Sequence, residues 1–446
     1  MGLSTVRVGA GSGFAGDRID PALALVERGH LDYLVFECLG ERTIAAANAR
    51  RLAGDGAPYD PLLRRRLSAV LAPALDRGTK IITNGGGADP VGAAQMCREV
   101  LEGRPANVAA ITGDDVLDVV RSLDPVVWEN SLPLSEQPGE LVSANAYLGA
   151  EPISQALAEG ADVVIGGRLA DPSLYVGPLA HEHGWDLSGD PEVLGRGTVV
   201  GHLLECAGQL TGGYYADPVT RPVQAMADLG FPFADVADDG NAILGKLADT
   251  GGILTVRTAT EQLLYEVGDP AAYLTPDVTA DFSGVTLEQV DADRVAVSAG
   301  SGTRRPDTLK VTLGFRGGWL GEGQVTYAGP RAVDRAQLAA DIVRERLEVV
   351  HGVPLESVSV ELIGTGAAHR GLTPVRDVPE VRLRVSAIVA TRELADAIGW
   401  EVEALYTNGP AGGGGARRSM TEVLAVRSCL IPRDVVATEV IHVGAA

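Results

Sequence analysis

His202, Glu205 and Cys206 are the residues whose types and spacing are best suited to chemistry. The surrounding pattern predicts a helix from Thr198 to Leu210, and spacings of three and four place the three side chains on one face of it. We therefore expect an acid/base pair, or a thiol nucleophile, at this point. The alternative is a core helix in which Glu205 satisfies His202 and Cys206 packs as a small apolar residue.

Arg168 is the second candidate catalytic residue. It follows a short apolar strand, Asp162 to Ile165, and a Gly-Gly pair. Asp171 and Pro172 then predict the start of a helix, with Asp171 as its N-cap. The pattern thus sets a cation at the C-terminal end of a strand, where it could hold a carboxylate, a phosphate or an oxyanion.

Five further apolar strands are predicted before residue 150, and each is followed by glycine, polar or charged residues. In a parallel sheet such ends share one edge, where ligands bind. The predicted strands are 5–8, 31–36, 80–83, 108–111 and 141–146. The substrate-binding candidates at these ends are Asp17, Arg18, Asn84, Gly85, Gly86 and Gly87, together with Asp171. We expect the N–H groups of Gly85 to Gly87 to help hold an anion.

A second interpretation comes from Gly11 to Gly16, which matches the G-x-G-x-x-G pattern of dinucleotide-binding loops, with Glu37 about 20 residues further on. However, Asp17 to Pro21 separate this motif from the helix that should begin inside it. An NAD-linked oxidoreductase therefore remains an alternative.

The length of 446 residues predicts two domains. Residues 1–284 alternate strands and helices, which predicts an α/β domain with a mostly parallel, layered sheet that carries the site. Residues 285–446 read β-α-β-β-α-β, the order of a smaller, ferredoxin-like α+β domain.

Composition excludes several classes of function. The net charge of −22 disfavours nucleic acid and anionic membranes as partners. We expect a soluble, cytoplasmic protein, because no signal pattern and no membrane-spanning apolar run is present. The four cysteines form no CxxC pair and the histidines no HExxH pattern, so we predict no disulfide framework, no metal and no cofactor.

Three long motifs resemble one known family, the acyclic terpene utilisation (AtuA-like) proteins. They are ADVVIGGRLADPSL from Ala161, GHLLECAGQLTGGYY from Gly201 and EQLLYEVGDPAAYLTPDVTAD from Glu261. The resemblance covers nearly the whole chain. It implies a cytoplasmic protein in the breakdown of branched terpenoids through acyl-CoA intermediates. Because many members carry an extra ferredoxin-fold domain that is lacking here, it also implies a small ferredoxin-fold partner protein. Motif matching adds Tyr265, Glu266 and Asp277 as substrate-binding candidates.

The resulting hypothesis is a metal-independent, homo-oligomeric enzyme acting on an acyl-CoA or hydroxyacyl substrate in branched or terpenoid acid catabolism. We expect a lyase or hydratase in which His202 and Glu205 exchange the proton and Arg168 holds the developing oxyanion. A CoA thioester would be the substrate. The alternatives are a non-catalytic scaffold subunit of an acyl-CoA carboxylase or hydratase system, and the NAD-linked oxidoreductase.

Overall fold

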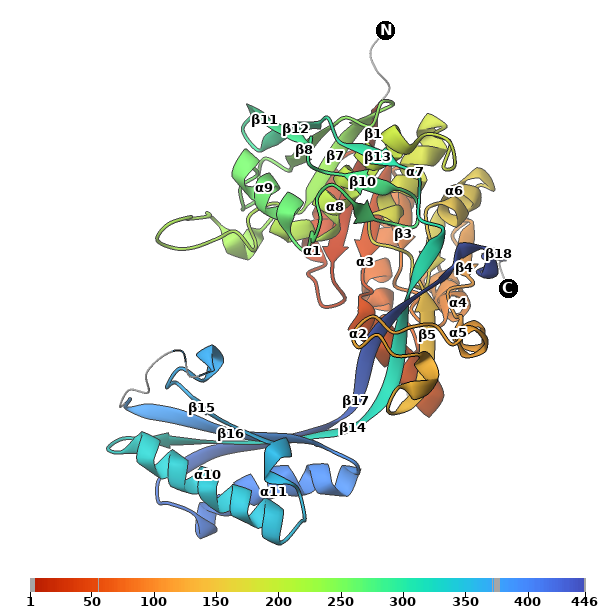
Figure 1. Ribbon diagram of the computed structural model, residues 1–446. Coiled ribbons are helices and arrows are strands. Elements are labelled where there is room, and N and C mark those ends of the chain that lie inside the picture. Colours follow the sequence, from red (N-terminus) through yellow and green to blue (C-terminus); the bar gives the residue numbers. More distant parts are fainter. Residues whose placement is uncertain (1–4, 55, 371, 373–377, 445–446) are drawn as a thin grey trace. The chain divides into compact units, whose positions relative to one another are not determined.

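The computed structural model describes residues 5–54, 56–370, 372 and 378–444, and the chain divides into two compact units (Figure 1). The first unit comprises Met1–Gln137, Val142–Leu313 and Val426–Ala446. The second comprises Pro138–Leu141 and Gly314–Ala425. The segments 285–313 and 426–446, expected in the second domain, therefore belong to the first unit.

The first unit is organised around a ten-stranded sheet, whose central five strands are parallel. Their order in the sheet is β1 (Thr5–Gly13), β2 (Tyr33–Glu37), β3 (Lys80–Thr83), β6 (Val163–Gly166) and β4 (Val108–Thr112). β2 and β6 are buried along their whole length. Short, largely apolar runs that bury both faces are typical of central parallel strands.

Antiparallel strands extend both sides of this parallel group, so the sheet is mixed. Beyond β1 lie β7 (Pro232–Ala237), β8 (Ala242–Lys246), β12 (Arg294–Ser298) and β11 (Thr286–Asp291). Beyond β4 lies β18 (Glu439–Val443), which pairs antiparallel with it. A separate three-stranded sheet has the order β13 (Ser301–Thr303), β10 (Thr279–Asp281) and β9 (Tyr273–Leu274).

One of the six strands expected in the parallel sheet lies outside it. β5 (Glu140–Ala146) pairs instead with β14 (Thr308–Ala328). The expectation was wrong because an apolar run shows that a segment is extended and buried but does not name its neighbour.

The helices of the first unit follow the strands. They are α1 (Asp20–Arg28), α2 (Glu41–Ala53), α3 (Leu63–Leu75), α4 (Pro90–Val100), α5 (Leu117–Leu123), α6 (Glu151–Ala158), α7 (Ser173–His183), α8 (Pro191–Glu205) and α9 (Val256–Leu264). Asp89 caps α4, accepting a hydrogen bond from the Gly92 N–H at 2.8 Å. Asp171 does not cap α7 as expected, because that helix begins two residues later and the Asp171 carboxylate binds Arg168.

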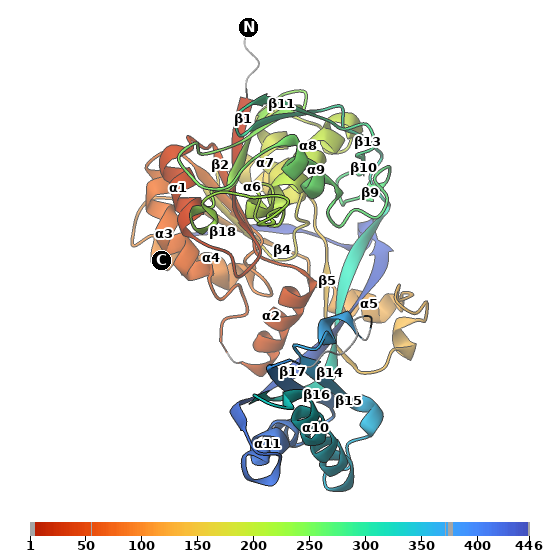
Figure 2. The same ribbon diagram turned by 90° about the vertical axis from the view of Figure 1, so that its left-hand side faces the viewer.

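The second unit runs from β14 through α10 (Ala332–Val349), β15 (Val358–Ile363), β16 (Glu380–Val389) and α11 (Arg392–Asn408) to β17 (Gly413–Pro432). Its sheet has the order β15-β16-β14-β17, and β16 is antiparallel to both neighbours. Both helices lie on the same face of this sheet (Figures 1 and 2). Alternate residues of β16, from Val381 to Ala387, are buried in a core that the two helices share.

Among the described residues, no helix combines the length and the apolar character that crossing a membrane would require.

Candidate active site

A cavity of about 320 Å³ in the first unit, which we call the Glu205 cavity, brings together side chains from segments far apart in the sequence. Its charged and phenolic lining consists of Glu41, Tyr147, Arg168, Asp171, Glu205, Glu266, Tyr273 and Lys310. Its apolar lining includes Trp128, Leu274, Leu309 and Leu430. A small volume with a few convergent polar groups among apolar ones is the usual form of a small-molecule site.

Arg168 lies just beyond β6 and is almost completely buried, with 1% of its surface exposed. Its guanidinium stacks over the Tyr147 ring, 3.9 Å from the ring centroid, and Nη1 donates to Asp171 Oδ1 at 2.9 Å. Burial lowers the pKa of Arg168, but the Asp171 charge opposes this and the net pKa lies well above its usual value. A permanent cation is therefore held at one wall of the cavity.

Lys310 supplies a second cation to the same wall. Its Nζ donates to Glu41 Oε1 at 3.0 Å, and the Tyr147 hydroxyl donates to the same oxygen at 2.5 Å. Burial alone would raise the pKa of Glu41, but the Tyr147 hydrogen bond and the charges of Arg168 and Lys310 lower it to about 2. Glu41 thus remains a carboxylate that holds Tyr147 and Lys310 in place.

Glu205, the last residue of α8, lines the cavity as a carboxyl group backed by a histidine. Its Oε1 lies 2.9 Å from His202 Nδ1, and its Oε2 has no hydrogen-bond partner among the described residues. His202 is 1% exposed and packs against the rings of Tyr273 and Phe282, each with centroids 5.3 Å away. His202 therefore lies behind Glu205 and does not line the cavity itself.

The Glu205 and His202 pair holds its proton more tightly than isolated side chains would. Burial raises the pKa of Glu205, against the opposing effect of His202. Burial lowers the pKa of His202, but the Glu205 charge and hydrogen bond raise it to a net value above the usual one. A carboxyl group with a raised pKa is a stronger base than an exposed one, which suits a group that exchanges a proton with a substrate.

Glu37, at the end of β2, is a further buried carboxyl group close to this site. Its Oε1 accepts hydrogen bonds from the Leu39 N–H at 2.7 Å and from Asn84 Nδ2 at 3.2 Å. Burial and the nearby Asp171 charge raise the pKa of Glu37 to about 8. Asn84 thus positions Glu37 and does not line the cavity, whereas sequence analysis expected Asn84 to bind substrate.

A family model described as "Acyclic terpene utilisation family protein AtuA" matches residues 6–442. The chain belongs to this family. No curated protein and no solved structure matches it. The family description gives a metabolic context without a reaction, so the chemistry of this AtuA-family chain has to be argued from its side chains.

The N–H groups of the glycine loop after β3 donate hydrogen bonds within the AtuA-family chain. The loop therefore does not provide the expected anion site. The N–H of Gly85 donates to Thr83 Oγ1 at 2.9 Å, that of Gly86 to the Gly166 carbonyl at 3.0 Å, and that of Gly87 to the Asn84 carbonyl at 3.3 Å. A Cβ on Gly86 would lie 2.6 Å from the Gly166 oxygen. The glycines thus allow two strand ends to approach closely.

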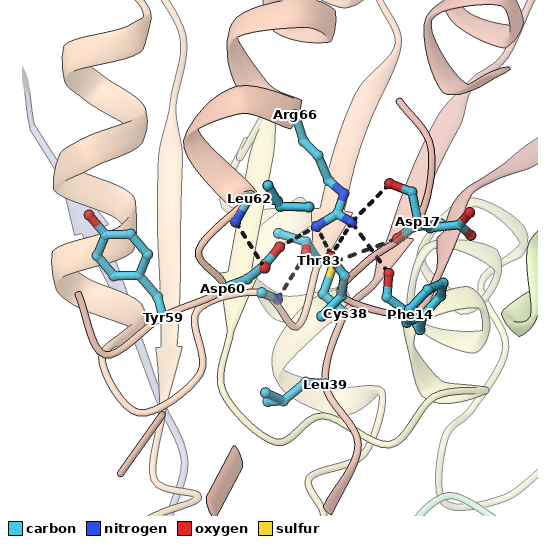
Figure 3. A network of polar contacts seen from close by, with 12 residues as sticks. Phe14, Asp17, Cys38, Leu39, Tyr59, Asp60, Leu62, Arg66 and Thr83 are labelled. Carbon is cyan, nitrogen blue, oxygen red and sulfur yellow. Dashed lines mark hydrogen bonds and ion pairs between the residues drawn. The ribbon is translucent and has the colours of Figure 1, made fainter. Parts of the chain in front are cut away.

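Arg66 of α3 fixes the loop that follows β1 (Figure 3). The buried guanidinium forms an ion pair with Asp60 and donates to the carbonyls of Phe14 and Ala15 at 3.3 and 2.6 Å. β1 runs through Gly13, and α1 begins only at Asp20. The G-x-G-x-x-G motif therefore lacks the helix start on which its dinucleotide reading depends.

Asp17, Arg18 and Cys206 border a different cavity, also of about 320 Å³. Asp17 accepts a hydrogen bond from the Gly13 N–H at 2.9 Å, and Arg18 donates to the Met226 carbonyl at 3.1 Å. Burial, followed by the Glu205 charge, raises the pKa of Cys206 above its usual value. Cys206 thus remains a neutral thiol, which disfavours its expected role as nucleophile.

Two of the three candidates from the third motif lie outside the Glu205 cavity. Glu266 lines it, whereas Tyr265 packs edge-on against Tyr214, 5.6 Å between centroids. Asp277 is buried and accepts hydrogen bonds from the Ser173 hydroxyl at 2.5 Å and the Ala150 N–H at 2.7 Å. Asp277 thus binds the N-terminal ends of α6 and α7.

The structure therefore unites Arg168, Asp171, Glu205 and Glu266 at one cavity and adds Glu41, Tyr147 and Lys310, which sequence reasoning did not select. Glu41 and Tyr147 follow predicted strands closely, so their position was a usable signal. Lys310 lies in the long strand β14, and no local pattern marks it. Among the described residues, no group of three or more His, Cys, Asp or Glu side chains is arranged to hold a metal ion.

Proposed function

We propose that this AtuA-family protein is an enzyme that moves a proton at the carbon next to the carbonyl group of a branched acyl or hydroxyacyl substrate, in the use of acyclic terpenes. The reaction would be a lyase or hydratase reaction, either carbon–carbon cleavage or the addition or elimination of water. Both proceed through an enolate, which requires a base on one side of the substrate and positive charge on the other.

Glu205 is the proposed base and acid. Its Oε1 is bound to His202 and its Oε2 has no hydrogen-bond partner among the described residues, so one oxygen can be oriented while the other exchanges a proton with the substrate. His202 is a positioning residue, because its ring is buried behind Glu205. The single observation that carries the proposal is that Glu205 has one hydrogen-bonded and one free carboxyl oxygen, among the described residues, in a cavity that is also lined by two cations.

Arg168 and Lys310 would stabilise the enolate oxygen. Both line the cavity, and both are associated with the Tyr147 ring, at 3.9 Å for Arg168 and 4.9 Å for Lys310. Their positions are fixed before substrate binds, which is the condition under which such groups contribute most to catalysis. A scaffold subunit, the alternative function, would not need a proton-exchanging group and two cations in the lining of one cavity.

The test is deuterium exchange. Wild-type protein is incubated in heavy water with a panel of branched acyl and 3-hydroxyacyl thioesters, and exchange next to the carbonyl is followed by mass spectrometry. We expect exchange with at least one panel member, and a loss of about 10²–10⁴-fold in Glu205→Gln, the range attributed to a general base.

Glu192→Gln is the matched control, because it makes the same change on the same helix at a side chain that is 77% exposed. It should exchange at the wild-type rate. Exchange in Glu205→Gln as fast as in wild type, or no exchange of any panel member by wild type, would contradict the proposal.

A further inference from the structure

Asp114, two residues after the end of β4, is a buried carboxyl group that does not line the Glu205 cavity but binds a residue that does. Its Oδ2 accepts two hydrogen bonds, from the backbone N–H of Arg168 at 3.0 Å and from Asn145 Nδ2 at 2.8 Å. Burial raises the pKa of Asp114, against the opposing effect of these hydrogen bonds. Because a raised pKa favours the uncharged form, we expect Asp114 to act as a hydrogen-bond acceptor more than as a charge.

The turn between β6 and Arg168 leaves room for this carboxyl group. A Cβ atom on Gly167 would lie 2.5 Å from Asp114 Oδ1, closer than a Cβ atom can approach another heavy atom. The glycine therefore lets the carboxyl group reach the Arg168 N–H. Asp171 and Tyr147 hold the guanidinium, so Asp114 fixes the backbone of Arg168 while other residues fix its tip.

Tyr147, on whose ring the Arg168 guanidinium is stacked, is held at the same junction. The N–H groups of the two residues that flank Tyr147 donate to the carbonyls of Asp114 and Arg168, at 2.7 and 2.9 Å. The N–H of Tyr147 itself donates to the Lys310 carbonyl at 2.9 Å. The backbone around Asp114 thus joins the three residues that form the cationic wall of the cavity.

Two buried asparagines extend these contacts to α2. Asn145 Oδ1 accepts a hydrogen bond from Asn48 Nδ2 at 2.9 Å, and both residues are at most 2% exposed. Asn48 belongs to α2, whose first turn carries Glu41. Hydrogen bonds in the protein interior are stronger than in water, so this chain of side chains ties α2 to the ends of β4, β5 and β6.

We propose that Asp114 is the positioning residue of Arg168: it sets the backbone from which the guanidinium reaches the enolate oxygen, and Asn145 and Asn48 hold it in place. This inference rests on the proposed function, which gives Arg168 its role at the enolate. Groups that stabilise a transition state act most strongly when their positions are fixed beforehand. A displacement of about 1 Å can lower a rate by about 10²-fold.

The experiment compares Asp114→Ala with Asp114→Asn in the assay of deuterium exchange into substrate. Asp114→Ala removes the acceptor and should lower the rate at saturating substrate by about 10–10²-fold, with a smaller change in KM. Asp114→Asn keeps one oxygen for the two donors that converge on Oδ2, and should restore most of the rate. Equal losses in the two variants would overturn the proposal, because charge and not position would then matter.

Asp118→Ala is the matched control, because it makes the same change four residues further on at a side chain that is 97% exposed. It should react at the wild-type rate.

The double variant Asp114→Ala with Arg168→Ala separates positioning from a general loss of structure. If Asp114 acts through Arg168, the double variant should react as fast as Arg168→Ala alone, because the guanidinium that Asp114 positions is already absent. A double variant that is measurably slower than Arg168→Ala would overturn the proposal.

Backbone hydrogen exchange at the Arg168 N–H, followed by mass spectrometry, tests the placement without any substrate. This N–H should exchange about 2–10-fold faster in Asp114→Ala than in wild type, as expected for loss of one hydrogen bond, and at the wild-type rate in Asp114→Asn. The amides of α10 in the second unit are the internal reference for folding. If Asp114→Ala does not fold, Gly167→Ala takes its place, because its Cβ would displace the carboxyl group.

Failure of the proposed function would appear differently. If wild type exchanged no substrate while the Arg168 N–H lost protection in Asp114→Ala, the placement would stand and the proposed reaction would be wrong. If wild type were active and Asp114→Ala kept either the full rate or the protected N–H, the positioning role alone would be wrong.

Discussion

Glu205 and Glu41 are two carboxyl groups in the wall of one cavity whose surroundings shift their pKa values in opposite directions. Burial dominates at Glu205 and raises its pKa, whereas Tyr147 and two cations lower that of Glu41 to about 2. Glu205 therefore binds a proton more readily than an exposed carboxyl group does, while Glu41 remains charged. Paired groups with divergent pKa values are a recurrent basis for assigning catalytic roles.

Glu37 allows a test of this electrostatic picture through stability. Its folded-state pKa of about 8 exceeds its ordinary value of 4.5, so the folded protein holds a proton there that the unfolded chain releases. Between about pH 5 and pH 8 its contribution to the free energy of unfolding should therefore fall as pH rises, by roughly 1 kcal/mol per pH unit.

Urea unfolding of wild type and Glu37→Gln across this pH range measures the effect. Glutamine keeps an oxygen to accept from the Leu39 N–H and Asn84. The stability of wild type relative to the variant should decline with pH. A difference that is constant between pH 5 and pH 8 would show that Glu37 is ionised in the folded protein.

For individual residues, the sequence correctly indicated cavity residues that follow predicted strands, such as Arg168 and Asp171. It could not separate Asn84, which binds Glu37, from a residue that lines the cavity, because both occupy strand ends. Nor could it show that His202 lies behind Glu205, since helical spacing gives a shared face and not the depth of each side chain.

Between elements, α10 and α11 of the second unit are joined by a buried carboxylate. Glu401 accepts from Arg346 at 2.6 and 3.0 Å and lies 2.8 Å from His351 Nε2. Burial would raise the pKa of Glu401, but the Arg346 and His351 hydrogen bonds lower it overall. A depressed folded-state pKa stabilises the protein above about pH 4.5 and less so as pH falls.

Glu401→Gln should therefore destabilise the protein by about 1–3 kcal/mol at neutral pH, the range for hydrogen bonds to charged groups. The measurement is thermal unfolding of the full chain, repeated at acid pH, where the difference should shrink. Glu403→Gln on the same helix breaks only an exposed pair with Arg418 and should change stability by less than about 1 kcal/mol. Equal effects of the two variants would refute the role of this contact.

Helices and strands were predicted well where the local run of apolar residues is enough to define them. The largely apolar and buried runs at β2, β3 and β6 were identified, as was the element order from β14 to β17. Pairing was predicted less well, because β5 resembles a parallel strand in sequence yet pairs with β14. The Asp-Pro pair correctly marked the start of a helix, but Asp171 is not its N-cap, because α7 begins at Ser173 and the Asp171 carboxylate binds Arg168.

For the whole molecule, the net charge of −22 opposes the approach of a negatively charged substrate, such as a CoA thioester, to the Glu205 cavity. Added salt screens that repulsion, since the Debye length falls from about 30 Å at 0.01 M to about 8 Å at 0.15 M. We therefore expect coenzyme A to associate faster as ionic strength rises over this range. Stopped-flow fluorescence of Trp128, which lines the Glu205 cavity, would follow it.

Pantetheine carries no charge and should associate at a rate that does not depend on salt. If coenzyme A instead bound more slowly with added salt, the local field of Arg168 and Lys310 would outweigh the charge of the whole chain, and the electrostatic argument would be wrong.

The path of the chain has a consequence for its synthesis. The first unit is completed by Val426–Ala446, which contributes Leu430 to the Glu205 cavity and β18 to the edge of β4. At about 5–20 residues per second, a ribosome reaches these residues roughly 15–65 s after it has made β4. During that interval β4 is an unpaired edge open to aggregation, and the Glu205 cavity lacks part of its lining. A nascent chain released before Leu430 could thus hold most of the sheet and bind nothing.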